Sequence, residues 1–134
     1  MNIPFVKMHA LGNDFVIMRG NAAPEFDAEF IRSISNRHTG IGFDQLMWLE
    51  PPRDSNNDIF YRIYNADGGE VEQCGNGARC IASLIAGPEP DQDQTYMLEF
   101  GAGIIEAEVA TNGEVRLNMG VPSLEPADLP VSYT

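Results

Sequence analysis

Basic residues are scarce in this chain of 134 residues, which holds eight lysines and arginines against twenty aspartates and glutamates. The formal net charge is therefore −12 at pH 7. A protein that binds a nucleic-acid backbone or an anionic membrane surface presents a basic patch. We therefore expect neither a nucleic-acid partner nor a membrane partner.

Lysine, cysteine and long apolar runs are also rare. Lys7 is the one lysine, whereas pyridoxal chemistry needs a lysine that forms a Schiff base. Cys74 and Cys80 are too few for a disulfide framework, and their spacing does not fit a zinc site, so we expect no metal. No apolar stretch approaches the roughly 18 residues of a membrane span. The first ten residues lack the pattern of a signal peptide, so a cytoplasmic protein with reduced thiols is expected.

The composition that remains is that of a soluble, globular domain. Hydrophobic residues make up 43% and charged residues 21% of the chain, which excludes a disordered polypeptide. The length corresponds to one domain with a core of its own. We place that domain at residues 1–120, because from Val121 onward Pro122, Pro126 and Pro130 punctuate a segment without periodicity. Residues 121–134 are interpreted as a linker toward a second domain.

Hydrophobic periodicity predicts a mixture of strands and helices. The sequence predicts strands at residues 3–8, 15–18, 45–50, 59–65, 70–73, 95–100, 103–110 and 114–119. A helix is predicted over 27–38, with Asp27 as its N-cap. The segment 74–80 should open a second helix, whose later, mostly apolar part runs from Ile81 and ends before Gly87. Turns are predicted at 11–14 and 66–69, and Asn112-Gly113 indicates a hairpin.

The most informative local feature is a thiol at the start of the second predicted helix. Cys74 precedes Gly75, Asn76 and Gly77, where the first backbone N–H groups of a helix have no partner within it. Those donors favour an anion such as a substrate carboxylate, and they lower the pKa of a nearby thiol. A thiolate beside a bound carboxylate is a candidate base for the α-proton of an amino acid. The spacing alone also allows Cys74 to be an ordinary small residue at a strand end.

Cys80 is expected to have a different role. It lies six residues further along the same helix, about 9 Å away, and off the face that carries Cys74. We interpret Cys80 as a buried, small hydrophobic residue. It is therefore not expected to act as a second catalytic thiol.

Uncharged amides recur at predicted turns and strand ends, at Asn13, Gln45 and Asn65. An amide there can hydrogen-bond a zwitterionic substrate without a charge of its own. Taken alone, each amide is better explained as an ordinary turn residue, since Asn is common in turns. His9 and His38 are isolated histidines, so neither is assigned a catalytic role; His38 is expected to end the first helix.

Four motifs in order give the chain a resemblance to the amino-terminal domain of the diaminopimelate epimerase family. The motifs run from Lys7 to Phe15, from Gly40 to Leu46, from Tyr61 to Gly68 and from Glu70 to Cys80, with a shorter match at Asn118-Met119-Gly120. The third contains Asn65-Ala66-Asp67-Gly68 and the fourth Cys74-Gly75-Asn76-Gly77-Ala78-Arg79-Cys80. The resemblance therefore covers nearly the whole chain.

This resemblance implies a fold, an activity and a site. The implied fold is α/β (α+β): a curved, mostly antiparallel sheet wrapped around a central helix, one of two pseudo-symmetric domains. The implied reaction interconverts LL- and meso-diaminopimelate without a cofactor, for lysine and peptidoglycan synthesis, with two cysteines as acid and base. Cys74 would be one of them. Asn13, Gln45, Asn65, Gly75 and Asn76 would bind the amino-acid substrate.

The chain departs from the family pattern because the domain with the second catalytic cysteine is missing. We therefore expect an isolated half that is inactive alone and that forms a homodimer through the face meant for the missing domain. Two alternatives stay open: an isomerase of the same fold that acts on another small acid, and an interaction module without catalysis. Substrate competition assays would distinguish the first alternative from a diaminopimelate epimerase. The length of the encoding gene would distinguish the second.

Overall fold

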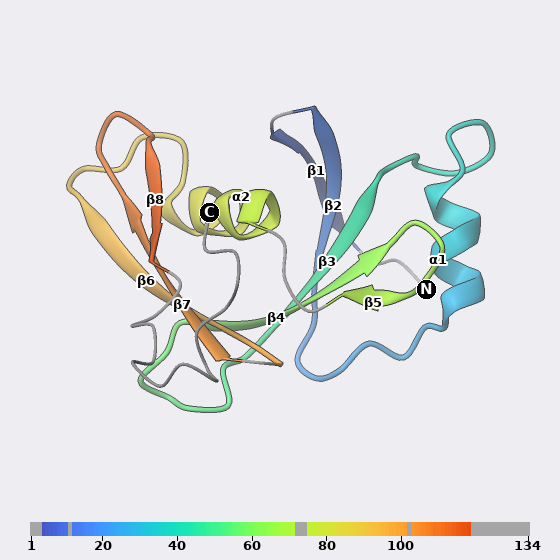
Figure 1. Ribbon diagram of the computed structural model, residues 1–134, viewed down its shortest axis with the longest axis horizontal. Coiled ribbons are helices and arrows are strands. Elements are labelled where there is room, and N and C mark those ends of the chain that lie inside the picture. The colour runs from blue at the N-terminus through green and yellow to red at the C-terminus, as the bar shows by residue number, and fades with distance from the viewer. Residues whose placement is uncertain (1–3, 11, 72–74, 102, 119–134) are drawn as a thin grey trace, which may run out of the picture.

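The computed structural model describes residues 4–10, 12–71, 75–101 and 103–118. They form a curved sheet with one helix in its hollow and a second helix on its outer side (Figure 1). The helices are α1 (Ala28–Ser35) and α2 (Gly75–Ala86). The strands are β1 (Phe5–Ala10), β2 (Asn13–Arg19), β3 (Gln45–Glu50), β4 (Ile59–Asn65), β5 (Glu70–Val71), β6 (Gln94–Phe100), β7 (Gly103–Val109) and β8 (Val115–Asn118).

The sheet runs in the order β1-β2-β3-β4-β6-β7-β8, with β5 paired to β4. Most neighbours are antiparallel, but β2 pairs with β3 and β4 pairs with β6 in parallel. A parallel pair needs a long crossover. The segment with α1 joins β2 to β3, and the segment with α2 lies between β4 and β6. The two helices therefore belong to two separate crossovers.

Alternation along the strands divides the apolar residues between the two faces of the sheet. Successive side chains of a strand point to opposite faces, so Phe15 and Ile17 of β2 share one face while Val16 and Met18 share the other. The first face packs against Ile81 of α2 in one buried cluster. The second face packs against Ile31 of α1 in another. We call these the α2 face and the α1 face.

The sequence-based fold is confirmed. The sheet is curved and mostly antiparallel around α2, and Asn112-Gly113 turns the β7–β8 hairpin, with Gly113 at a φ of 91° that glycine tolerates. Trp48 is buried and its ring meets that of Phe26 edge to face, and the Phe26 ring also stacks on that of Phe30.

Several predicted boundaries are wrong. The helix predicted over 27–38 ends at Ser35, because Asn36 adopts an extended backbone and its Oδ1 accepts hydrogen bonds from the N–H groups of His38 and Thr39. His38 therefore does not end a helix. The predicted turn at 11–14 is shorter, since Asn13 and Asp14 already pair with Ala10 and His9 in the β1–β2 ladder. The first strand is Phe5–Ala10 rather than 3–8.

Part of the expected organisation lies outside the described residues. The proposed linker at 121–134 belongs there, and so do Cys74 and the last two residues of the strand predicted over 70–73. Among the described residues, no helix combines the length and the apolar character that a membrane crossing requires.

Candidate active site

The three predicted amides lie at one end of the sheet. Asn13 begins β2, Gln45 begins β3, which runs parallel to β2, and Asn65 ends β4, which runs antiparallel to β3. Gln45 lies directly opposite Asn65 in the ladder, and Gln45 Nε2 donates a hydrogen bond of 3.0 Å to Asn65 Oδ1. Two of the three amides are thus in contact.

All three amides continue the α2 face. Asn13 is two residues from Phe15, Gln45 two from Met47 and Asn65 two from Ile63, and these three apolar residues belong to the cluster around α2. Each of the amides is half-buried. The apolar core of the α2 face therefore ends in a row of neutral hydrogen-bonding groups.

A backbone network joins the same three strand ends. The N–H of Asp44 donates to the carbonyl of Asp14 at 3.0 Å, and the N–H of Ala66 donates to the carbonyl of Asp44 at 3.1 Å. The carboxylate of Asp44 in turn accepts from the N–H of Asp14 at 2.9 Å. Asp14, Asp44 and Ala66 are the sequence neighbours of Asn13, Gln45 and Asn65. The network therefore fixes the backbone next to each amide.

Arg37 closes this network with its side chain. Its guanidinium nitrogens lie 2.7 Å from Asp14 Oδ2 and 3.1 Å from Asp44 Oδ1. The bond to Arg37 holds the pKa of the Asp14 carboxyl below its usual value, and the same bond raises the pKa of Arg37. His9 Nδ1 also contacts Asp14 Oδ1, and Lys7 Nζ lies 3.9 Å from Asp14 Oδ2. Asp14 is therefore ionised at neutral pH.

The remaining predicted site residues lie at the start of α2. Gly75 is the first residue of the helix, so the N–H groups at this end have no acceptor within it, as expected for an anion site. Val71 of β5 pairs with Ile63 of β4, and Gly75 follows Val71 by four residues, at most about 14 Å of chain. The chain therefore limits the distance between the start of α2 and Val71, which pairs with the strand that carries Asn65. Cys74 lies outside the described residues, and its role stays a prediction.

Cys80 is buried in the core, as the sequence predicts. It is 4% exposed and belongs to the core cluster of the α2 face. Its neighbours Ala78, Ile81 and Ala82 are buried in the same cluster. The expectation of a buried, small hydrophobic residue is confirmed.

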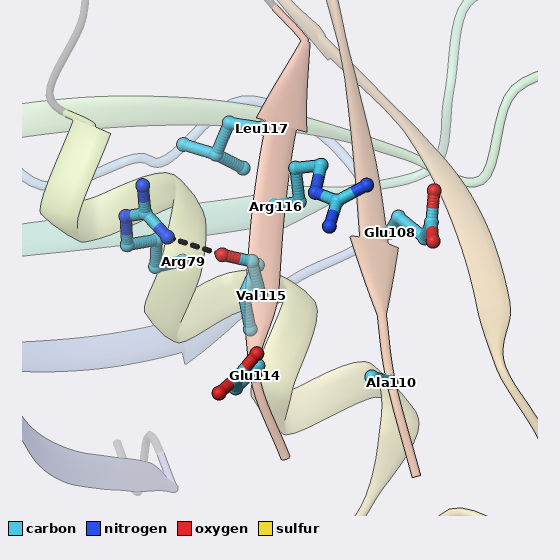
Figure 2. Close-up of a pocket in the computed structure, with 7 residues that line it drawn as sticks. All are labelled: Arg79, Glu108, Ala110, Glu114, Val115, Arg116 and Leu117. Atoms are coloured by element: carbon cyan, nitrogen blue, oxygen red, sulfur yellow. Dashed lines mark hydrogen bonds between the residues drawn. The ribbon is translucent and has the colours of Figure 1, made fainter. Parts of the chain in front are cut away.

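Arg79, from the same motif, fastens α2 to the far edge of the sheet. Figure 2 shows its guanidinium directed at β8, where Nη1 donates a hydrogen bond to the carbonyl of Val115. Arg79 lines a pocket of about 240 Å³ together with Glu108, Ala110, Glu114, Val115, Arg116 and Leu117. Of the predicted site residues that the structure describes, Asn13, Gln45 and Asn65 do not line this pocket. The arginine of this motif therefore helps to hold α2 in place.

A wider cleft, of about 760 Å³, lies on the opposite side of the sheet. Its lining includes Phe5 from β1, Met18 from β2, Phe30 and Ile34 from α1, and Trp48 from β3. The three described amides, Asn13, Gln45 and Asn65, lie outside its lining as well. The described part of the candidate site therefore lies outside this larger cleft. It consists of one end of the sheet and the start of α2.

The sequence did not single out Asp14, Arg37 and Asp44. A signal was present, since an aspartate adjoins both Asn13 and Gln45 and an arginine stands between them in the chain. What the sequence lacked was the register, because the parallel pairing of β2 with β3 brings positions 14 and 44 together.

Solved structures of epimerases and isomerases share this architecture. The methylitaconate-delta-isomerase structure matches with a TM-score of 0.66 and 18% identity, over 82% of this chain and 35% of that one. A hydroxyproline epimerase of Agrobacterium vitis matches with a TM-score of 0.62 and 16% identity, over 81% of this chain and 37% of that one. At such identities the likeness concerns the fold alone. The described chain has the architecture of one domain of this epimerase and isomerase fold.

The sequence comparison is more specific. The family model described as diaminopimelate epimerase matches residues 5–125, so the chain belongs to the diaminopimelate epimerase family. The diaminopimelate epimerase of Nitrosomonas eutropha is 48% identical over 134 residues, which cover 97% of this chain and 48% of that protein. That of Chromobacterium violaceum is 47% identical over 131 residues, again 97% of this chain and 48% of that protein. The chain spans about half the length of these relatives.

Proposed function

We propose that this chain is the amino-terminal half of a cofactor-independent epimerase that interconverts LL- and meso-diaminopimelate, in the cytoplasmic synthesis of lysine and peptidoglycan. One observation carries the proposal: in a chain of this family, Asn13, Gln45 and Asn65 share one end and one face of the sheet. Neutral amides there can bind the ammonium and carboxylate groups of an amino acid without fixing its charge state.

In this proposal the start of α2 binds the substrate carboxylate. The N–H groups of Gly75 and Asn76 and the positive end of the helix dipole favour an anion. The thiolate of Cys74 removes the α-proton, and the electron pair remains on the α-carbon, where the adjoining carboxylate delocalises it. A thiol on the opposite side of the α-carbon then returns a proton and inverts the centre.

The second thiol has to come from outside this chain. Cys80 is buried among Ala78, Ile81 and Ala82, so it does not reach a substrate at the start of α2. The relatives are about twice as long as this chain, which supports a second half as its source. We therefore propose that the chain is inactive alone and needs the second half as its partner.

The first test is the incorporation of solvent deuterium at the α-carbon of LL-diaminopimelate. We expect no exchange with the chain alone, and exchange once the carboxyl-terminal half of the Nitrosomonas eutropha relative is added. Cys74→Ala should abolish the restored exchange, whereas Cys80→Ala, which removes the buried thiol, should preserve it. Exchange by the chain alone would contradict the need for a second half. A mixture that folds but remains inert would contradict the proposed function, and competition with other small acids would then identify a different substrate.

The exposed end of the α2 face also predicts self-association, because a face left without its partner tends to pair with a copy of itself. We propose a homodimer through this face. Light scattering at increasing concentration should show a mass of twice 14.7 kDa. A mass that stays at 14.7 kDa up to millimolar concentration would contradict the dimer, and loss of the dimer on addition of the second half would support this assignment of the interface.

A further inference from the structure

We infer that Arg37 is a positioning residue that holds the three candidate substrate-binding amides in place through Asp14 and Asp44. The inference rests on the proposed function, since it concerns the same site. Arg37 is far from the amides in the chain: it follows α1, whereas Asn13, Gln45 and Asn65 belong to three strands. Its guanidinium nevertheless bridges the residues next to two of them.

The geometry makes this connection specific. The side chains of Asp14 and Asn13 point to opposite faces because the two are neighbours within β2. Arg37 therefore holds β2 on the α1 face, and the amides face α2. Its influence on the site passes through the backbone, along the bonds that connect Asp14 to Asp44 and Asp44 to Ala66.

A planar guanidinium suits this position. It presents two N–H donors in a fixed fork, so one side chain can bind two carboxylates at a set distance from each other. The two bonds of Arg37 are 2.7 Å long to Asp14 and 3.1 Å long to Asp44. They set the distance between the starts of β2 and β3. The same separation governs where Asn13 and Gln45 present their side chains.

The bond between Gln45 and Asn65 makes the effect measurable without a substrate. Gln45 Nε2 is ordered by its hydrogen bond to Asn65 Oδ1, and this bond depends on the positions of the two strand ends. If Arg37 sets those positions, its loss frees the side-chain amide of Gln45. Exposed ion pairs contribute little to overall stability, so the rest of the molecule should hardly respond.

The test compares Arg37→Gln with Arg19→Gln in the ¹⁵N-labelled chain. Arg19 is an exposed arginine at the other end of β2, so both variants lose one positive charge, but only Arg37→Gln loses it at the amide end of the sheet. We expect the order parameter of the Gln45 side-chain NH₂ to fall below about 0.6 in Arg37→Gln and to stay unchanged in Arg19→Gln. An unchanged value in both variants overturns the inference. So does a loss of order spread over the whole sheet, since Arg37 would then support the fold in general.

Arg37→Lys separates geometry from charge. A lysine keeps the positive charge but cannot bind both carboxylates in a fixed fork, so it should behave as the glutamine variant does. Full order of Gln45 in Arg37→Lys would overturn the bridging role and leave a role for charge alone.

Titration with meso-diaminopimelate, followed by the NH₂ signals of the three amides, connects the inference to the proposed function. If the chain binds, Arg37→Gln should weaken the affinity about tenfold, the equivalent of losing one preorganised hydrogen bond, and an unweakened affinity would count against the inference. Absence of binding by the unaltered chain mixed with the second half would count against the proposed function, while the order parameters still decide the role of Arg37.

Discussion

The two faces of the sheet are covered in different ways. On the α2 face one helix lies in the hollow of the sheet, and its Ile81 and Ala82 join strand residues from β2 to β7 in one continuous cluster (Figure 1). On the α1 face a shorter helix buries Ile31 against β2 and β3 in a smaller cluster. The cleft of about 760 Å³ opens directly beside Phe30 and Ile34 of that helix.

The part of the outer side near β4 and β6 is covered by a loop. Glu99 of β6 is 6% exposed, and its carboxylate accepts hydrogen bonds from the N–H groups of Arg53 and Asp54 at 2.7 and 3.0 Å and from Asn57 Nδ2 at 2.5 Å. The guanidinium of Arg53 lies 4.1 Å from the centre of the Phe60 ring. Apolar packing thus holds the α2 face together. On the outer side, hydrogen bonds and other polar contacts hold much of the structure in place.

The difference explains where a site can form. The α2 face is held together by its apolar interior, so its edge can present Gln45 and Asn65 to a ligand without weakening the core. The ion pairs that fix the same strand ends lie on the other face, where Arg37 bonds to Asp14 and Asp44. Binding groups and supporting groups are thereby separated by the thickness of one sheet.

The largest effect should come from the core of the α2 face. Ile81→Ala should lower the free energy of unfolding by about 4 kcal/mol, and the matched change Ile31→Ala on the α1 face by about 2 kcal/mol. Both side chains are fully buried, but α1 lies beside an open cleft and can settle into the space, whereas α2 is enclosed by the sheet. Urea unfolding measures both values. Equal losses of unfolding free energy in the two variants would contradict the proposed difference in packing between the two faces.

The next effect concerns the attachment of α1. Gly68 has a φ of +93°, and a Cβ at this position would lie 2.5 Å from Ala28 Cβ and 2.7 Å from Ala28 Cα. Gly68→Ala should therefore cost about 3 kcal/mol, from backbone strain and displacement of α1.

Gly113→Ala is the control, because Gly113 has a φ of +91° with nothing within 4 Å of the added Cβ. It should cost about 1 kcal/mol, from backbone strain alone. Thermal unfolding of both variants compares them. A Gly113→Ala variant as unstable as Gly68→Ala would show that the contact with α1 contributes nothing.

The smallest of these effects concerns the loop beside β6. Burial raises the pKa of the Glu99 carboxyl, but the hydrogen bonds from Asn57, Arg53 and Asp54 outweigh burial and lower it below its ordinary value. A lowered pKa means that the ionised form stabilises the folded state above the unfolded pKa of about 4.3, and that this contribution is lost as the pH falls through the folded pKa.

Glu99→Gln should thus cost about 1–2 kcal/mol at pH 7 and less below pH ~4. Unfolding at a series of pH values measures the difference between the variant and the unaltered chain. A difference that grows toward acid pH would contradict the assignment, and Glu89→Gln, in the exposed loop after α2, is a matched change that should have no effect.

Much of the fold follows from the sequence because periodicity reports burial directly. The strand predicted over 59–65 is present, and the alternate residues Tyr61 and Ile63 are buried together in the α2 cluster. Helix ends were less accurate, since the end of α1 depends on the side chain of Asn36 and not on any hydrophobic pattern. Each amide could be identified from the sequence. The contact between Gln45 and Asn65, however, depends on strand register, which no local sequence pattern specifies. The ion pairs of Arg37 were missed for the same reason.

The reversal of chain direction between β3 and β4 has a consequence for handedness. Nearly all connections between parallel strands are right-handed. The β2–β3 and β4–β6 units advance the same way across the sheet, but the second pair points opposite to the first. Two crossovers of the same hand must then place their helices on opposite sides, where α1 and α2 lie. Because the two right-handed crossovers belong to strand pairs of opposite direction, the candidate binding groups lie on one side of the sheet. The ion pairs that support them lie on the other side.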